Sequence, residues 1–124
     1  MNLDPSFVVG DLTIVTETPP DSVRLRWLGK SNARNPAQEL APLFARVLAL
    51  ASERRVGLEL RFEALEHFNS STISAVIQLI HQGRAQATKI LIVFDPRIKW
   101  QRLSFESLRI LARPDGLLEL RPLS

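Results

Sequence analysis

The sequence predicts an α/β domain in which helices pack on a mixed, mostly parallel sheet. Stretches of strand character alternate with stretches of helical periodicity along most of the 124 residues. Consecutive strand–helix–strand units form parallel strand pairs with right-handed crossovers. The run 89–94 is apolar almost throughout, which is typical of a parallel strand buried on both faces. Before these units, two strand-like stretches joined by a proline-rich turn predict an antiparallel hairpin.

The composition is that of a globular chain. Hydrophobic residues make up 45% and charged residues 23%, and we expect one domain over residues 1–124. The absence of cysteine excludes disulfides, thiolate zinc sites and cysteine nucleophiles. The N-terminus shows no basic segment followed by an apolar core, and no apolar run approaches the ~20 residues of a membrane helix. We therefore expect a cytoplasmic protein.

The N-terminal hairpin is predicted from two alternating stretches. Residues 7–15 form the first strand, with a break at Gly10 and Asp11, and residues 23–27 form the second. The turn at 19–22 separates them. An exposed first strand could pair with a copy of itself, so both a monomer and a homodimer stay open.

A polar loop over 29–35 leads into the first helix. Asn35 precedes Pro36, the order typical of an N-cap followed by proline at the first helical position. An interior proline costs about 3 kcal/mol, so Pro42 predicts that the regular helix begins nearer Glu39. The helix closes at 52–55.

The remaining elements alternate regularly. The run 56–62 is a strand, and apolar residues from Ile73 begin a helix that ends near Ala85. The strand at 89–94 follows, and apolar spacing predicts a third helix over 100–111 and a last strand over 117–120. The third helix is expected to expose Arg102, Glu106, Arg109 and Arg113.

Three adjacent hydroxyls mark the passage from strand to helix. Ser70, Ser71 and Thr72 follow Phe68 and Asn69 where the second helix is predicted to begin. A helix N-terminus has unsatisfied N–H groups and the positive end of the dipole, so a phosphate there gains hydrogen bonds and a favourable field. Ordinary N-capping explains the same residues without any chemistry.

The order of elements and this turn resemble the STAS domain (sulphate transporter and anti-sigma factor antagonist) over nearly the whole chain. In that family an apolar residue precedes Asp-Ser-Ser-Gly, and the matching residues here are Phe68, Asn69, Ser70, Ser71 and Thr72. The family phosphoacceptor falls on Ser71. A related branch with Asn-Thr-Ser is modified at the position of Ser70, so both remain open. Asn69 in place of Asp removes a negative charge, and Thr72 in place of Gly adds bulk and a third candidate acceptor.

The resemblance implies a bacterial, non-enzymatic regulator of transcription that switches partners. The expected partners are a GHKL-type serine kinase that acts as an anti-sigma factor and a serine phosphatase, and no cofactor is expected. The partner-binding residues would be Phe68, Asn69, Ser70, Ser71 and Thr72, together with Arg34 of the preceding loop. The alternative is a STAS-like scaffold that is never phosphorylated.

Other sites are less well supported by the sequence. His67 and His81 lack metal-ligand spacing, and no nucleophile-elbow pattern surrounds Ser70. Glu63 and Glu66 fit a solvated loop better than a catalytic pair. The last third of the chain is basic, but few aromatic residues accompany its arginines, so we expect neither nucleic acid nor a membrane as partner. Core packing is the commoner role for Trp100.

Overall fold

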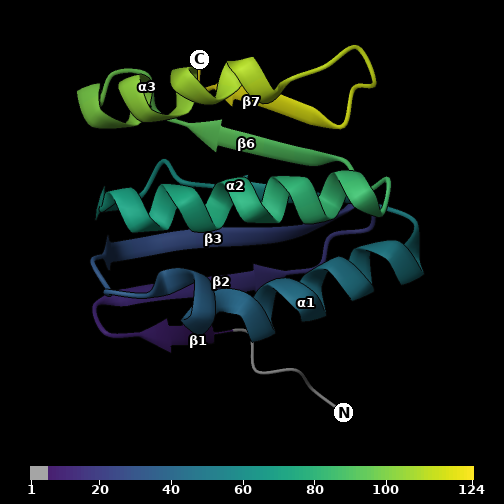
Figure 1. Cartoon of the computed structure of the whole chain (residues 1–124), viewed down its shortest axis with the longest axis horizontal. Helices are drawn as coiled ribbons and strands as arrows, with labels where there is room; N and C mark the ends of the chain where they lie inside the picture. Colours follow the sequence, from purple (N-terminus) through teal and green to yellow (C-terminus); the bar gives the residue numbers. More distant parts are fainter. Residues whose placement is uncertain (1–5) are drawn as a thin grey trace.

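The computed structural model describes residues 6–124; the segment 1–5, on which the expectation of no secretory signal partly rests, lies outside the described residues. A seven-stranded sheet runs through the molecule in the order β1-β2-β3-β4-β6-β7, with β5 beside β3 (Figure 1). The strands are β1 (Ser6–Val9), β2 (Leu12–Glu17), β3 (Ser22–Ser31), β4 (Gly57–Arg61), β5 (Leu65–Phe68), β6 (Ile90–Phe94) and β7 (Leu118–Pro122). The helices are α1 (Pro36–Arg54), α2 (Ser70–Ala85), α3 (Lys99–Glu106) and the 3-10 helix η1 (Ser107–Leu111).

The pairing confirms the predicted fold class. β1, β2 and β3 are antiparallel neighbours, whereas β3, β4, β6 and β7 pair in parallel. β4 pairs with residues 22–26 of β3, and β5 pairs in parallel with residues 29–31 of the same strand. β4 and β5 therefore follow one another along the same side of β3.

All three α-helices pack against one face of the sheet. α1 and α2 lie side by side in front of the strands in Figure 1. Aromatic rings connect the layers. The ring centre of Trp27 in β3 lies 6.3 Å from that of Phe44 in α1 and 4.8 Å from that of Phe62. Phe105 of α3 lies 4.7 Å from Phe62 and 5.5 Å from Phe94 of β6. Because these rings share one core, α3 covers the same face as α1.

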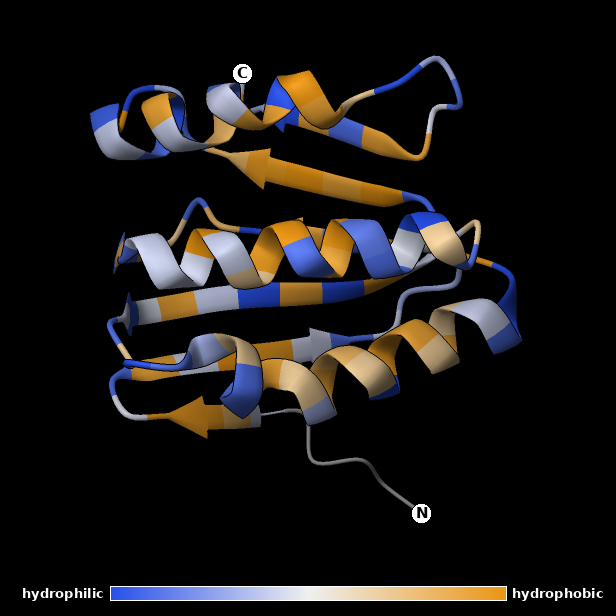
Figure 2. Cartoon of the chain, in the orientation of Figure 1, coloured by the Kyte–Doolittle hydropathy of each residue, from blue (hydrophilic) through white to orange (hydrophobic). Residues whose placement is uncertain are grey.

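The other face of the sheet carries charged side chains. Glu59 lies 2.9 Å from Arg24 and 3.1 Å from Arg61, and Glu63 lies 2.8 Å from Arg61. Alternation along the strands places Leu58 and Leu60 of β4 in the core and Glu59 on this outer face. Figure 2 shows the same pattern as alternating orange and blue bands on β3. In residues 6–124 no helix covers this face, so the fold has two layers.

The first predicted strand is wrong in one respect. Residues 7–15 are two antiparallel strands, because the chain reverses at Gly10 and Asp11 and pairs Val9 with Leu12. Gly10 has φ +58, a conformation that glycine adopts without the clash of a Cβ atom. The reversal makes β1 one of the two end strands of the described sheet, with β7 at the other end.

The predicted loop over 29–35 is wrong for its first three residues. β3 continues to Ser31 because β5, which the sequence analysis did not predict, pairs with this extension. Gly29 has φ +84, and a Cβ atom there would lie 2.2 Å from the carbonyl oxygen of Asp11. Only glycine therefore allows β3 to pass the β1–β2 turn.

The first helix also departs from its predicted start. α1 begins at Pro36, and Pro42 lies inside it. Leu40, Leu43 and Phe44 on either side of Pro42 are buried, so packing of the helix holds it through the proline.

The other helices lie close to their predicted positions. α2 ends at Ala85 as predicted, and the third helix is divided into α3 and η1. Glu106 and Arg109, two of the residues expected on the exposed side of the third helix, form an ion pair. Over residues 6–124, no helix is long and apolar enough to cross a membrane.

Candidate functional site

The hydroxyl-bearing turn lies at the carboxyl edge of the parallel strands. β5 ends at Phe68, Asn69 caps the helix, and α2 begins at Ser70. The loops that follow β3 and β6 leave the sheet at the same edge, on the left of Figure 1. The turn therefore shares this edge with the loops that precede α1 and α3.

Asn69 fixes the turn through both ends of its side-chain amide. Its Oδ1 accepts a hydrogen bond from the backbone N–H of Thr72 at 2.9 Å, which is the N-cap interaction. Its Nδ2 donates to the carbonyl oxygen of Ala33 at 2.9 Å, and its backbone N–H donates to that of Ser31 at 3.0 Å. An aspartate could not make the bond to Ala33, because an ionised carboxylate only accepts hydrogen bonds.

Thr72 is enclosed beneath the turn. Its side chain is 0% exposed, and its Oγ1 lies 2.7 Å from Oγ of Ser31 and donates to Oδ1 of Asn69 at 2.7 Å. A phosphate on this hydroxyl would have to break both contacts and enter the core. The threonine that replaces the family glycine thus has a structural use in this chain.

Ser70 and Ser71 occupy the first two positions of α2 and are both exposed. Within residues 6–124 neither hydroxyl makes a hydrogen bond, and the first turn of α2 carries no acidic residue. The helix is 16 residues long, so its N-terminus presents free N–H groups and a positive partial charge. Of the three predicted acceptors, these two are accessible where an added anion is best tolerated.

Phe68 supports the turn from below. It is 7% exposed, and its ring lies 4.9 Å from Trp100 and 5.5 Å from Phe105, both of α3. Trp100 is half-buried and also approaches His67, with ring centres 6.2 Å apart. The first turn of α3 is therefore next to the end of β5. Phe68 packs between the end of β5 and α3 and is largely buried there.

Gln101 is a structural residue of this edge that the sequence analysis missed. Its side chain is 0% exposed, and Oε1 accepts from the backbone N–H of Asp95 at 2.8 Å. Nε2 donates to the carbonyl oxygens of Phe62 at 2.8 Å and Leu65 at 3.1 Å. The only signal in the sequence was a polar residue at a core position of an amphipathic helix.

Two exposed basic residues lie in the loops that follow β3 and β6 at this edge of the sheet. Arg34 is exposed in the loop whose Ala33 carbonyl bonds to Asn69, so the loop that carries this expected partner-binding residue is fastened to the turn. Arg97 follows β6 and donates to Oδ1 and Oδ2 of Asp95, each at 3.1 Å. These hydrogen bonds lower the pKa of Asp95 below its ordinary value.

The other sequence candidates do not converge on a reactive centre. Nowhere in residues 6–124 do three His, Asp or Glu side chains lie close enough to hold a metal ion. His67 contacts the ring of Trp100, and His81 is exposed on α2. Glu63 is bonded to Arg61 on the outer face of the sheet.

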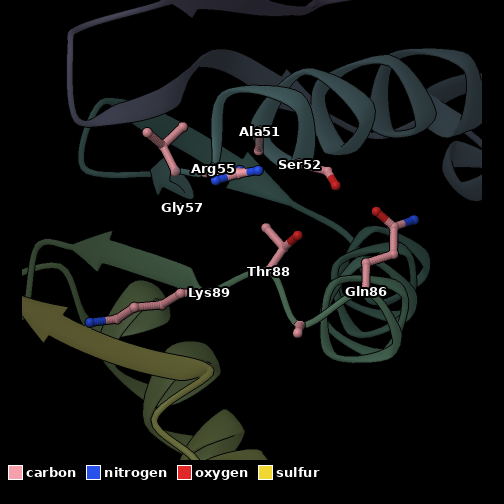
Figure 3. A pocket seen from close by; sticks show the side chains of 9 residues that line it. Ala51, Ser52, Arg55, Gly57, Gln86, Thr88 and Lys89 are labelled. Atoms are coloured by element: carbon pink, nitrogen blue, oxygen red, sulfur yellow. The ribbon is translucent and has the colours of Figure 1, made fainter.

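A hollow lies at the opposite edge of the sheet. It has a volume of about 420 Å³ and is lined by residues at the ends of α1 and α2 and the beginnings of β4 and β6. Figure 3 shows Thr88 between Arg55 and Gln86, and the side chain of Lys89 pointing away from Arg55. Lys89 pairs with Glu119 at 3.1 Å. The hollow thus has no contact with the turn at Ser70.

Comparison with known proteins gives the fold. No protein-family model and no curated protein matches the sequence. An uncharacterized DUF3478-family protein from Shewanella loihica PV-4, described as having a SpoIIAA-like fold, aligns with a TM-score of 0.54 and 13% identity, over 97% of this chain and 89% of that one. The anti-sigma factor antagonist SpoIIAA in its unphosphorylated form aligns with a TM-score of 0.48 and 18% identity, over 64% of this chain and 71% of that one. The chain therefore has a SpoIIAA-like α/β fold, in agreement with its resemblance to STAS domains.

Proposed function

We propose that this chain is a non-enzymatic bacterial signalling protein that switches partners when a serine at the start of α2 is phosphorylated. The observation that carries the proposal is the exposure of Ser70 and Ser71 at the first two positions of α2, beside the half-buried cap Asn69, whose side-chain oxygen and nitrogen are both hydrogen-bonded. A kinase can reach these hydroxyls without unfolding the turn. By resemblance, the kinase is a GHKL-type anti-sigma factor, a serine phosphatase reverses the reaction, and transcription is the process controlled.

The switch would operate through charge. A phosphate adds about −1.5 to −2 charges at neutral pH. In the free protein the N–H groups of α2 and water stabilise that charge. In a complex that covers the turn, the same charge would be desolvated against the partner surface, which is costly unless the partner supplies a cation. Phosphorylation would therefore separate the complex, with a coupling that typically changes affinity about 5- to 150-fold.

The decisive experiment identifies the acceptor. The purified protein is incubated with ATP and the serine kinase encoded nearest to its gene, and intact mass and peptide mapping follow the addition of one phosphate. We expect Ser71→Ala or Ser70→Ala to abolish the addition, and Thr72→Val to leave it unchanged because Thr72 is enclosed. An unmodified protein, or modification lost only in Thr72→Val, would contradict the proposal.

A second measurement tests the switch itself. Binding of the same kinase, without nucleotide, is compared for Ser71→Ala and Ser71→Asp by calorimetry, with the corresponding pair at Ser70. We expect the alanine variant to bind like the wild type and the aspartate variant to bind at least about fivefold more weakly. Equal binding by both variants at both positions would exclude charge-controlled binding at this turn.

The alternative function is a scaffold that binds partners without modification. It is favoured by one observation: Asn69 and Thr72, the residues that depart from the family pattern, both serve the internal hydrogen-bond network. A kinase that binds this protein with equal affinity before and after exposure to ATP, without any mass change, would support this function.

A further inference from the structure

α3 and η1 expose an apolar stripe on the side that faces away from the core. Leu103 is 58% exposed and Ile110 is 87% exposed, and Val8 is the third large hydrophobic residue of 6–124 with such exposure. Leu103 lies three residues after the half-buried Trp100 and seven before Ile110, a spacing that keeps the three side chains on one side of a helix. We call Trp100, Leu103 and Ile110 the α3 stripe.

The stripe is held rigidly in place. The opposite side of the same two elements is buried through Gln101, Phe105 and Leu108. Gln101 is hydrogen-bonded to three backbone groups at the strand ends, and Phe105 lies 4.7 Å from Phe62. The exposed side chains therefore do not gain burial by a small shift of α3. Figure 2 shows orange residues alternating with blue and white ones along this coil.

The segment that carries the stripe is basic, although Arg97 is paired with Asp95 and Arg109 with Glu106. The segment 97–113 contains five basic residues and one acidic residue, a balance of +4, whereas the whole chain has +3. The remainder of the chain is therefore −1, and the entire basic excess belongs to this segment. Its basic residues are Arg97, Lys99, Arg102, Arg109 and Arg113, all exposed.

We propose that the α3 stripe is a docking surface for an acidic amphipathic helix of another protein. Apolar side chains of such a helix would cover Leu103 and Ile110, and its carboxylates would meet the surrounding arginines. A nucleic acid would gain contacts to the basic residues but none from exposed Leu and Ile. A membrane-surface helix buries a broad apolar face, whereas this stripe is narrow because the other side of α3 is committed to the core.

The surface adjoins the turn described above but does not depend on its phosphorylation. Trp100 lies 4.9 Å from Phe68 at the end of β5, so the stripe begins beside the turn. At the other end of the stripe, the carbonyl of Leu111 in η1 accepts a hydrogen bond from Arg84 in the last turn of α2 at 2.8 Å. A partner bound there could also reach Ser71, or could bind independently of it. Failure of phosphorylation would therefore leave this inference intact.

Tryptophan fluorescence gives a direct test. Trp27 is 0% exposed and Trp100 is half-buried, so a ligand on the stripe changes the emission of Trp100 selectively. The full chain is titrated with a tryptophan-free amphipathic helical peptide built from Leu and Glu, and with a matched peptide in which Lys replaces Glu. We expect saturable binding of the acidic peptide, weakened by salt, and at least about tenfold weaker binding of the basic one.

Substitutions locate the surface. Leu103→Gln with Ile110→Gln should weaken binding of the acidic peptide about tenfold or more, because both side chains are exposed and the fold does not need them. Val8→Gln removes the same chemistry from β1 and should leave binding unchanged. No binding of the acidic peptide, equal binding of the two peptides, or equal loss in Val8→Gln would overturn the inference. Binding of phosphatidylglycerol vesicles but not of the peptide would overturn it in favour of a membrane surface.

Discussion

At the scale of single residues, the turn before α2 contains two kinds of residue: those that hold the turn by hydrogen bonds and those that are exposed. The side-chain oxygen of Asn69 caps the helix, and its side-chain nitrogen donates a hydrogen bond to the carbonyl of Ala33. Asn69 therefore joins the turn to the preceding loop. Thr72 closes the same network against Ser31. The two serines between them remain outside it. A modification of either serine would therefore change the surface charge without breaking the bonds that hold the turn.

Substitution of Asn69 tests this division. Asn69→Ala removes both the cap and the bond to Ala33, and loss of an N-cap alone costs about 0.5–2 kcal/mol. Asn69→Asp keeps the cap and adds a favourable charge at the helix N-terminus, but it loses the donor to Ala33. We expect the free energy of unfolding, measured by urea denaturation, to fall in the order Asn, Asp, Ala. An Asp variant no more stable than Ala would show that the cap contributes nothing here.

At the scale of elements, α3 is attached to the strand ends through one buried amide. The side chain of Gln101 reaches from α3 to the ends of β4 and β6 and to the first residue of β5. The carbonyl oxygen of Phe62 also accepts a hydrogen bond from the backbone N–H of Leu65 at 2.9 Å, so Gln101 adds a second bond there. The glutamine thus joins α3 to three strand ends and fixes it beside the turn.

Gln101→Leu should therefore be strongly destabilising although leucine is similar in size. It leaves the N–H of Asp95 and the carbonyl of Leu65 without the partner that Gln101 supplies, whereas the carbonyl of Phe62 keeps the N–H of Leu65. Each buried unsatisfied group costs about 1–3 kcal/mol, so we expect a loss of about 2 kcal/mol or more in urea denaturation. Arg102→Gln, on the exposed side of α3, is the control and should stay within about 0.5 kcal/mol. A Gln101→Leu loss below about 1 kcal/mol would mean that these groups find other partners.

The loop between β6 and α3 makes stability depend on pH. Asp95 accepts hydrogen bonds from Arg97, and these lower its pKa in the folded state. A carboxyl with a lowered pKa stabilises the fold fully above its unfolded pKa of about 3.9, and this contribution is lost as the pH falls through the folded value. Asp95→Asn should be less stable than the wild type at pH 7, and the difference should shrink below about pH 4. The measurement is thermal unfolding of both proteins at a series of pH values. A difference in stability that stays constant down to about pH 2.5 would rule out this linkage.

At the scale of the whole molecule, hydrophobic periodicity predicted the order of the elements better than it predicted where the strands begin and end. The order of helices and parallel strands followed from alternating periods, because each parallel strand and each helix buries one continuous apolar pattern. The break at Gly10 and the strand β5 could not be read in the same way. β5 is four residues long with only its end residues Leu65 and Phe68 buried, so it has no alternation to detect. Gln101 was missed because its partners are backbone groups 36 and 39 residues away.

The same limit applies to the candidate site. The position of Asn69, Ser70 and Ser71 at a helix start was predictable, since capping residues stood between a strand pattern and a helix pattern. The burial of Thr72 was not, because it depends on Ser31, which lies 41 residues away in a segment predicted as a loop. The sequence thus predicts where the hydroxyls lie, and only the packing separates the exposed pair from the enclosed one.

The exposed strand β1 should exchange its amide hydrogens differently from the strands at the centre of the sheet. Within residues 6–124, β1 pairs with β2 alone, its Val8 is 64% exposed, and its Phe7 and Val9 are half-buried, whereas β3 and β4 lie at the centre. Amides of a central strand exchange only on global unfolding, but an edge strand can separate alone. In a monomer, hydrogen exchange followed by mass spectrometry should therefore show β1 exchanging much faster than β4.

If two copies instead pair through β1, as the exposed edge allows, its amides should be protected at high protein concentration and lose that protection on dilution. Fast exchange of β1 at every concentration would exclude a dimer through this edge, and slow exchange at every concentration would require a tight one.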